Sequence, residues 1–292
     1  MKPLLRFIQS AFTGVALLCL AYFAWQSQDV LHTLLAQTQW SYLFIAVLCW
    51  IFVQLISVQE TKLQLQTLFV QLSYQKIYYI HVNRLPARYI PGGIWHTVSK
   101  MVDFHQIGVK KSHLGSLFLL ESILAVFMSF LIGGSLVFYF RGLDHFWGII
   151  AGLSALSSLL AIVAIPWLWS YQYVKLPKLN IAQYFKAASL FILIWTAASG
   201  AFISYLSAFP QLLKQTHLLE VAGSYIFSWS VGYLMIFAPQ GIGVFEVVSG
   251  SLLNLSMQLL DAAIIIAGFR IITLFGDIGL WAITKLFYRH NI

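Results

Sequence analysis

The chain has 292 residues, of which 60% are hydrophobic and only 9% are charged, whereas about 25% of residues are charged in soluble domains. A soluble protein of this length could not bury so much apolar surface, so lipid must be the solvent for much of it. The formal charge of +8 would suit nucleic acid, but the Lys and Arg residues lie between apolar runs. We therefore predict no nucleic-acid partner, and attribute the charge to membrane topology and anionic head groups.

Six apolar runs are long enough to cross a bilayer, which takes roughly 20 mostly apolar residues per helix. In chain order they are Phe7–Trp25, Trp40–Val58, Gly115–Tyr139, Phe146–Trp169, Ala187–Leu206 and Asp261–Phe287. The first run follows Lys2 and Arg6 and resembles a signal sequence, but it is long for one, so we expect an uncleaved span. The sequence predicts an all-α, polytopic membrane helical bundle, folded as a single integral membrane domain over residues 1–292.

Two further regions, Tyr74–Lys110 and Leu218–Met257, are apolar but interrupted by Pro and Gly. Lys and Arg gather before the first run, around the first interrupted region, before Ala187 and at the C-terminus. This alternation predicts a multi-pass protein of the inner (plasma) membrane with both termini cytoplasmic, provided that each interrupted region crosses an even number of times. Each region is then two full crossings or a re-entrant or kinked helical hairpin, giving about eight membrane segments and a candidate inverted repeat.

Helices broken inside a membrane carry a functional implication. Pro and Gly interrupt the helical hydrogen-bond ladder, and the freed backbone groups are tolerated in hydrocarbon only where protein or water covers them. Interrupted segments in corresponding positions of two halves are typical of a transporter site. The alternative is a pair of proline-kinked spans with no special role.

The first interrupted region contains a candidate anion site. Two glycines allow a turn, and a helix restarting after them would point unsatisfied N–H groups back toward it. With cations close by, a lipid phosphate is the natural ligand. The candidate head-group residues here are Arg84, Arg88, Pro91, Gly92, Gly93 and Trp95, with Lys100 as a further cation. The competing interpretation is that these cations contact bulk head groups only.

The second interrupted region repeats this pattern with Pro239, Gly241, Gly243 and Glu246. Glu246 falls in the first turn after the glycines, where a carboxylate also complements the helix dipole.

Arg270 lies well inside the last apolar run, and a charge at that depth predicts a functional site and a partner. Glu246 is the candidate partner. Asp277, on the same helix face, and Glu121 are candidate ion-pair or proton-relay groups. A purely structural ion pair is the competing account of Arg270.

Other site chemistries find little support. Cys19 and Cys49 lie in apolar stretches and read as buried hydrophobic residues, although a disulfide remains open. His96, His105 and His113 are too widely spaced for a local metal motif. Nucleophile elbow, HExxH and P-loop motifs are absent from the sequence. We predict no catalytic residues, no metal and no cofactor, while noting that an intramembrane enzyme could assemble its residues from different helices.

The chain resembles the lysylphosphatidylglycerol synthase transmembrane-region family, also called the flippase-domain family. The similarity rests on Tyr89–Trp95, Pro239–Glu246 and Phe269-Arg270, in the family's order and spacing over essentially the whole chain. Gly93 departs from the lysine of many relatives, and Gln240 from a usual glycine. The resemblance implies the lipid-translocating region without the soluble aminoacyl-transfer domain, because the sequence ends just after the last apolar run.

These observations predict a flippase or lipid-handling transporter for an anionic phospholipid or a polyprenyl-phosphate-linked glycan carrier. Membrane lipids would be the partners, with a glycosyltransferase or other envelope-synthesis protein as a further candidate. The first alternative is an accessory membrane protein that binds lipid or such an enzyme and moves nothing. The second is an intramembrane lipid-linked transferase.

Overall fold

The computed structural model describes residues 35–89, 95–171, 176–213, 216–235, 241–253 and 258–287, and the single positions Tyr22, Trp25, Gln28 and His32. The predicted span Phe7–Trp25 lies almost wholly outside these residues, and Pro91, Gly92, Gly93 and Pro239 lie fully outside them. All regular secondary structure in the described part is helical, which confirms the predicted fold class.

Five of the described helices are long and apolar enough to cross a membrane. They are α3 (Trp40–Thr67), α6 (Lys111–Arg141), α7 (Phe146–Ser170), α8 (Ile181–Ser207) and α11 (Leu259–Phe287). Each contains one predicted span completely. The described part of the chain is therefore a multi-pass helical membrane bundle.

The outer surface of the bundle is apolar. Along α7, which packs against α6, Leu153, Leu160 and Val163 each expose more than half of their surface, at 63%, 63% and 61%. In water these side chains would be an aggregation surface, whereas hydrocarbon solvates them without cost.

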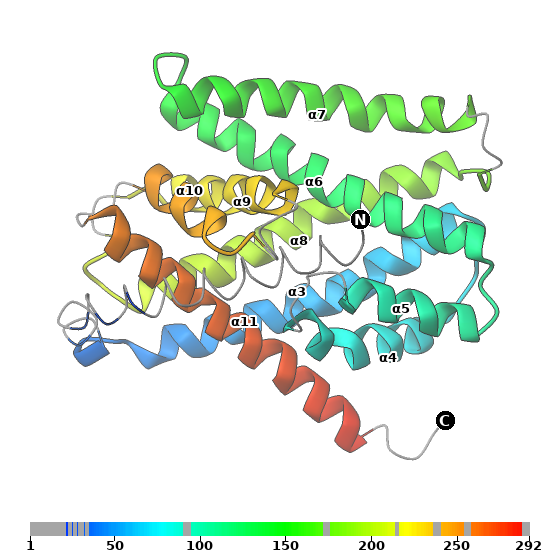
Figure 1. Ribbon diagram of the computed structural model, residues 1–292, viewed down its shortest axis with the longest axis horizontal. Helices are drawn as coiled ribbons and strands as arrows, with labels where there is room; N and C mark the ends of the chain where they lie inside the picture. The colour runs from blue at the N-terminus through cyan, green and yellow to red at the C-terminus, as the bar shows by residue number, and fades with distance from the viewer. Residues whose placement is uncertain are drawn as a thin grey trace.

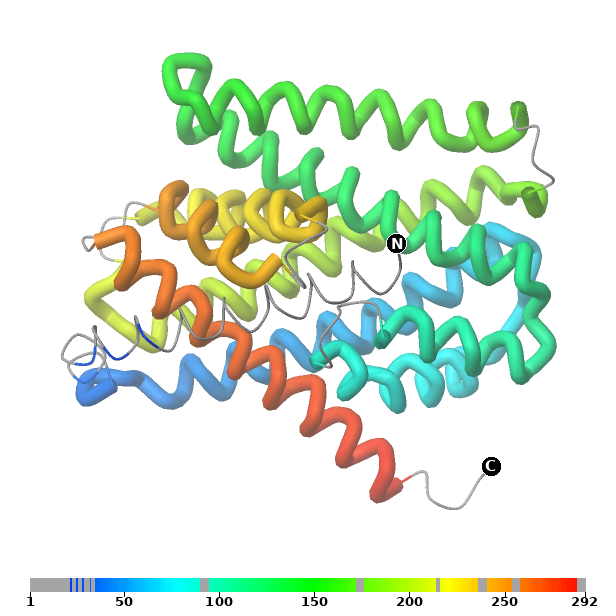
Figure 2. The backbone as a smooth tube through the Cα atoms, viewed as in Figure 1, coloured from blue at the N-terminus to red at the C-terminus, as the bar shows by residue number. Residues whose placement is uncertain are grey.

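Four shorter α-helices form two pairs, each of which reverses inside the bundle (Figures 1 and 2). The first pair, called the first hairpin, consists of α4 (Tyr74–Arg84), the 3-10 helix η1 (Leu85–Tyr89) and α5 (Trp95–Gln106). The second hairpin consists of α9 (Leu218–Leu234) and α10 (Val244–Leu252). Both predicted interruptions are thus real breaks in helical structure, and each hairpin begins and ends at the same end of the bundle.

The order of elements occurs twice. A long helix, a hairpin and a second long helix follow one another as α3, α4–α5 and α6, and again as α8, α9–α10 and α11. The contacts recur as well: α4 packs against α11 as α9 packs against α6, and α3 packs against α11 as α8 packs against α6. The two sets run in opposite directions, with α3 and α8 antiparallel and in contact (Figure 1).

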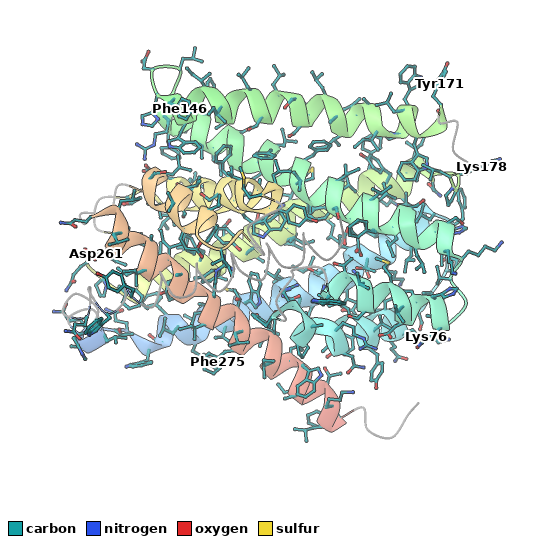
Figure 3. The ribbon with its side chains drawn as sticks, viewed as in Figure 1. Lys76, Phe146, Tyr171, Lys178, Asp261 and Phe275 are labelled. Atoms are coloured by element: carbon teal, nitrogen blue, oxygen red, sulfur yellow. The ribbon has the colours of Figure 1, made fainter. Side chains whose placement is uncertain are left out.

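The two ends of the bundle differ in charge. Lys76 and Lys178 lie at one end, where α6 also begins with Lys111, and we call this the lysine-rich end (Figure 3). Phe146 and Asp261 lie at the opposite end (Figure 3), where Arg141 is paired with Glu220 at 3.1 Å. The first hairpin enters from the lysine-rich end and the second from the opposite end (Figure 1).

Small residues bring the helices close enough for this packing. A Cβ built on Gly133 of α6 would lie 2.5 Å from the backbone nitrogen of Phe227 in α9. One built on Gly134 would lie 2.7 Å from the carbonyl oxygen of Ala151 in α7. Close approach of this kind is a common way for helices to associate in lipid.

Candidate functional site

Two ion pairs join the hairpins to α11. Arg270 of α11 donates from Nε to Glu246 Oε1 of α10 at 2.7 Å, which confirms the predicted pairing. Seven residues further along α11, Asp277 Oδ2 accepts from Arg88 Nη1 of η1 at 3.0 Å. Residues seven apart lie on the same helix face about 10 Å from each other. One face of α11 therefore holds both hairpins.

The second hairpin is shaped by its glycines. Gly241 has a φ of +67°, and a Cβ on it would lie 2.7 Å from the Cα of Gly232 in α9, so only glycine fits. Gly243, at φ +86°, precedes α10 and donates its N–H to Glu246 Oε2 at 2.7 Å. The Glu246 carboxylate, only 1% exposed, thus caps the helix and neutralises Arg270 at once.

The Asp277 carboxylate anchors the first hairpin to α11. Its side chain is fully buried, and it accepts from Trp50 Nε1 of α3 at 2.9 Å and from the Tyr89 hydroxyl at 3.0 Å, besides Arg88. Three donors compensate much of the cost of burying the charge. The sequence singled out Asp277 and Arg88 separately but did not join them, and it gave no signal for Trp50.

Both arginines keep part of their surface accessible and lie near one buried hydroxyl. Arg88 and Arg270 each expose 29% of their side chains, and the charges of both act on Tyr225 of α9. Tyr225 belongs to an aromatic cluster formed with Phe202, Phe245 and Phe269. Arg270 also lies over the Phe245 ring, with Cζ 5.9 Å from the centroid. The centre of the bundle thus combines two cations with an apolar wall.

A third ion pair lies nearer the lysine-rich end. Lys100 of α5 donates from Nζ to both Glu121 oxygens of α6, at 2.7 and 2.8 Å, and Thr61 of α3 donates to Oε1 at 2.9 Å. Glu121 therefore belongs to an ion pair, one of the two roles predicted for it.

The remaining predicted residues are more peripheral. Arg84 makes a two-bonded pair with Asp103, at 2.6 Å for each bond, and exposes 41% of its side chain. Trp95 begins α5 and is 37% exposed. Among the described residues, no group of three or more His, Cys, Asp or Glu side chains could hold a metal ion.

Arg84→Gln is expected to lower the free energy of unfolding by about 1 kcal/mol, because Arg84 exposes 41% of its side chain, although Asp103 exposes only 15%, and partly solvated ion pairs contribute little. Chemical denaturation in mixed micelles measures the change. A loss several times larger would mean that this pair, rather than the pairs on α11, holds the first hairpin in place.

No protein-family model matches the chain, and no curated protein matches it either. The geometry alone must therefore support a function. An arginine carries five N–H donors, so a guanidinium paired with a carboxylate can also bind an anionic oxygen on its accessible side. The arrangement suits reversible binding of an anion with an apolar portion.

Proposed function

We propose that the protein is a membrane lipid flippase or lipid-handling transporter for an anionic phospholipid or a polyprenyl-phosphate-linked carrier. The observation that supports this most directly is the position of two partly accessible arginines: Arg88 of the first hairpin, paired with Asp277, and Arg270 of α11, paired with Glu246 of the second hairpin. A lipid phosphate would contact these cations, and its hydrocarbon would follow the aromatic cluster and the apolar helix faces.

The lengths of the two α-helices of the first hairpin favour a re-entrant segment. At about 1.5 Å per residue, the 11 residues of α4 and the 12 of α5 fall well short of a hydrocarbon core of about 30 Å. The N-terminal run Phe7–Trp25 would complete six full spans. The lysine-rich end would then face the cytoplasm of the inner membrane, with both chain termini on that side.

The repeated order of elements suggests how a head group would move. The first hairpin would open toward the cytoplasmic side and the second toward the other side, as expected for an inverted repeat. Because α11 holds both hairpins, a phosphate that replaces Asp277 on Arg88 or Glu246 on Arg270 would loosen one hairpin at a time. The paired carboxylates would close the path when no lipid is bound.

Reconstitution into vesicles tests the proposal. Purified protein is expected to move fluorescent phosphatidylglycerol, measured by dithionite quenching of the outer leaflet, much faster than fluorescent phosphatidylcholine. Arg88→Gln and Arg270→Gln are each expected to reduce the phosphatidylglycerol rate by at least about tenfold, since losing one charged hydrogen bond costs about 1.5–3 kcal/mol.

Arg84→Gln is the matched control, because it removes a paired arginine from the same region and should leave the rate unchanged. Equal movement of both lipids, or wild-type rates in both site variants, would contradict the proposal. Specific phosphatidylglycerol binding without movement would instead favour an accessory role.

A further inference from the structure

The cluster around Lys100 contains more carboxylates than cations. Lys100 Nζ contacts both oxygens of Glu121, and Glu60 of α3, only 5% exposed, lies close enough for the charges of both residues to act on it. Two carboxylates, that of Glu60 buried and that of Glu121 15% exposed, thus lie near one ammonium. An uncompensated charge in such a place is costly, and the usual remedy is to bind a proton.

The partner of Glu60 points to that proton. Gln64, one helical turn along α3, is fully buried and hydrogen-bonds through its amide nitrogen to Glu60 Oε1. The Gln64 Oε1 atom, however, is buried and has no hydrogen-bond partner among the described residues. A carboxylate can only accept hydrogen bonds, whereas a protonated carboxyl group can also donate one. In the reversed amide orientation, a hydroxyl on Glu60 donates to Gln64 Oε1 while Nε2 takes the buried position that Oε1 occupies here, so a protonated Glu60 keeps one hydrogen bond to Gln64 and needs no cation.

The other polar groups around this part of α3 include two histidines, and Nδ1 of His81 and Nε2 of His96 are buried without a hydrogen-bond partner among the described residues. His81 of α4 lies 3.2 Å from Gln54 Oε1 through Nε2 and packs edge-on against His96 of α5, and the charge of Lys100 acts on both rings. Other titratable or charged groups on α4, η1, α8 and α11 form hydrogen bonds of their own. Tyr74 donates to Leu55 O, Tyr184 donates to Ile162 O, Tyr78 bonds to Thr284, Arg88 donates to Asp277, and Asp277 also accepts from Trp50. The charges that act on Glu60 are therefore those of Lys100, which attracts its carboxylate, and of Glu121, which repels it.

We propose that Glu60, with Glu121 and Lys100, forms a buried proton-binding site, and that this proton is the coupling ion for lipid movement. The second clause rests on the proposed function. Glu60 lies seven residues before the end of α3, about 10 Å from the lysine-rich end, so an exchange path to that side would be short.

The protonation state of Glu60 affects the first hairpin through Lys100 of α5. With a proton on Glu60, the net charge of Glu60, Glu121 and Lys100 is zero, and Lys100 is paired with Glu121 alone. When the proton leaves to water, Glu60 becomes a carboxylate and the cluster gains one negative charge. Lys100 is then attracted by two acids, one on α3 and one on α6, and the pull acts directly on α5. Proton release and movement of the first hairpin are thereby linked.

A proton fits this place better than a metal ion. A cation such as Na⁺ at Glu60 would lie beside the Lys100 ammonium and would need several oxygen ligands. A proton becomes part of the carboxyl group and needs only Gln64 as an acceptor.

Infrared difference spectroscopy on the full chain in nanodiscs tests the site without any lipid assay. A protonated carboxyl has a C=O band separate from that of a carboxylate. On raising the pH, the wild-type protein is expected to lose such a band, and Glu60→Gln is expected to lack it. Glu60→Asp, which keeps a titratable group, should retain a shifted band. Glu220→Gln, at the opposite end of the bundle, is the control and should leave the band unchanged.

Absence of a pH-dependent band, its survival in Glu60→Gln, or a response to Na⁺ at constant pH would overturn the proton site. Coupling is tested in vesicles by imposing a pH gradient, which is expected to accelerate phosphatidylglycerol movement in the wild type and not in Glu60→Gln. Lipid movement at the same rate with and without the pH gradient would overturn the coupling of the proton to lipid movement and leave the proposed function intact. A normal band in a protein that moves no lipid would leave the proton site intact and contradict the proposed function.

Discussion

Asp277→Ala is expected to lower the free energy of unfolding by about 3 kcal/mol or more, at the lower end of the range for breaking a buried ion pair. The carboxylate is fully buried and accepts from Arg88, Trp50 and Tyr89. Removing it leaves a guanidinium, an indole N–H and a hydroxyl without this acceptor, and it frees the tip of the first hairpin from α11. Chemical denaturation in mixed micelles measures the loss.

Asp277→Asn removes the negative charge of the side chain and keeps its shape. Asparagine keeps one oxygen that can accept from Trp50, but its amide nitrogen cannot accept from Arg88 or Tyr89. We expect an intermediate loss of stability and a loss of lipid movement close to that of Arg88→Gln. Asp144→Asn, at an exposed position in the turn after α6, makes the same chemical change and should alter neither property. Equal stability of Asp277→Ala and the wild type would show that this carboxylate does not anchor the hairpin.

Gly241→Ala is expected to cost at least about 2 kcal/mol of stability and to abolish lipid movement. A residue with a side chain in this left-handed conformation costs about 1–3 kcal/mol. The added Cβ would also lie 2.7 Å from the Cα and 2.9 Å from the carbonyl carbon of Gly232, which are backbone atoms that cannot rotate away. The start of α10 must then shift, and Glu246 shifts with it away from Arg270.

Gly279→Ala in α11 is the matched control. A Cβ at Gly279 meets nothing within 4 Å, and alanine in a helix is more favourable than glycine by roughly 1 kcal/mol. Gly279→Ala should therefore be neutral or slightly stabilising in the same denaturation experiment. Similar stability changes for the two variants would mean that the second hairpin tolerates a displaced tip.

Hydropathy alone predicted the cores of five long helices but not all of their ends. The predicted run Trp40–Val58 stops nine residues short of α3, which continues to Thr67. The missing segment contains Glu60, Thr61 and Gln64, all buried inside the bundle. Polar residues that face other helices carry no apolar signal, so this extension of α3 looks like a loop in the sequence.

An ion pair of the site could be predicted from the sequence when each of its two residues was unexpected in its own apolar segment. Arg270 is a deep charge and Glu246 follows a break, and each needed a partner. Arg88 is 189 residues from Asp277, and cations near a break also satisfy the positive-inside rule. Sequence alone therefore left Arg88 assigned to lipid and left Asp277 without a partner. Glu60 was not recognised, because a single acid near the end of an apolar run resembles an ordinary helix terminus.

The position of α7 has a topological consequence. A long helix, a hairpin that returns and a second long helix bring the chain back to the side on which it began, so two such sets in direct succession would share one orientation. One additional crossing between them turns the second set over. Among the described helices, α7 supplies that crossing, and it packs against α6 at the margin of the bundle. The face of α7 toward α6 must keep its small residues, because a Cβ on Gly152 would lie 2.9 Å from the Phe138 ring, whereas the opposite face need only remain apolar enough to traverse the bilayer.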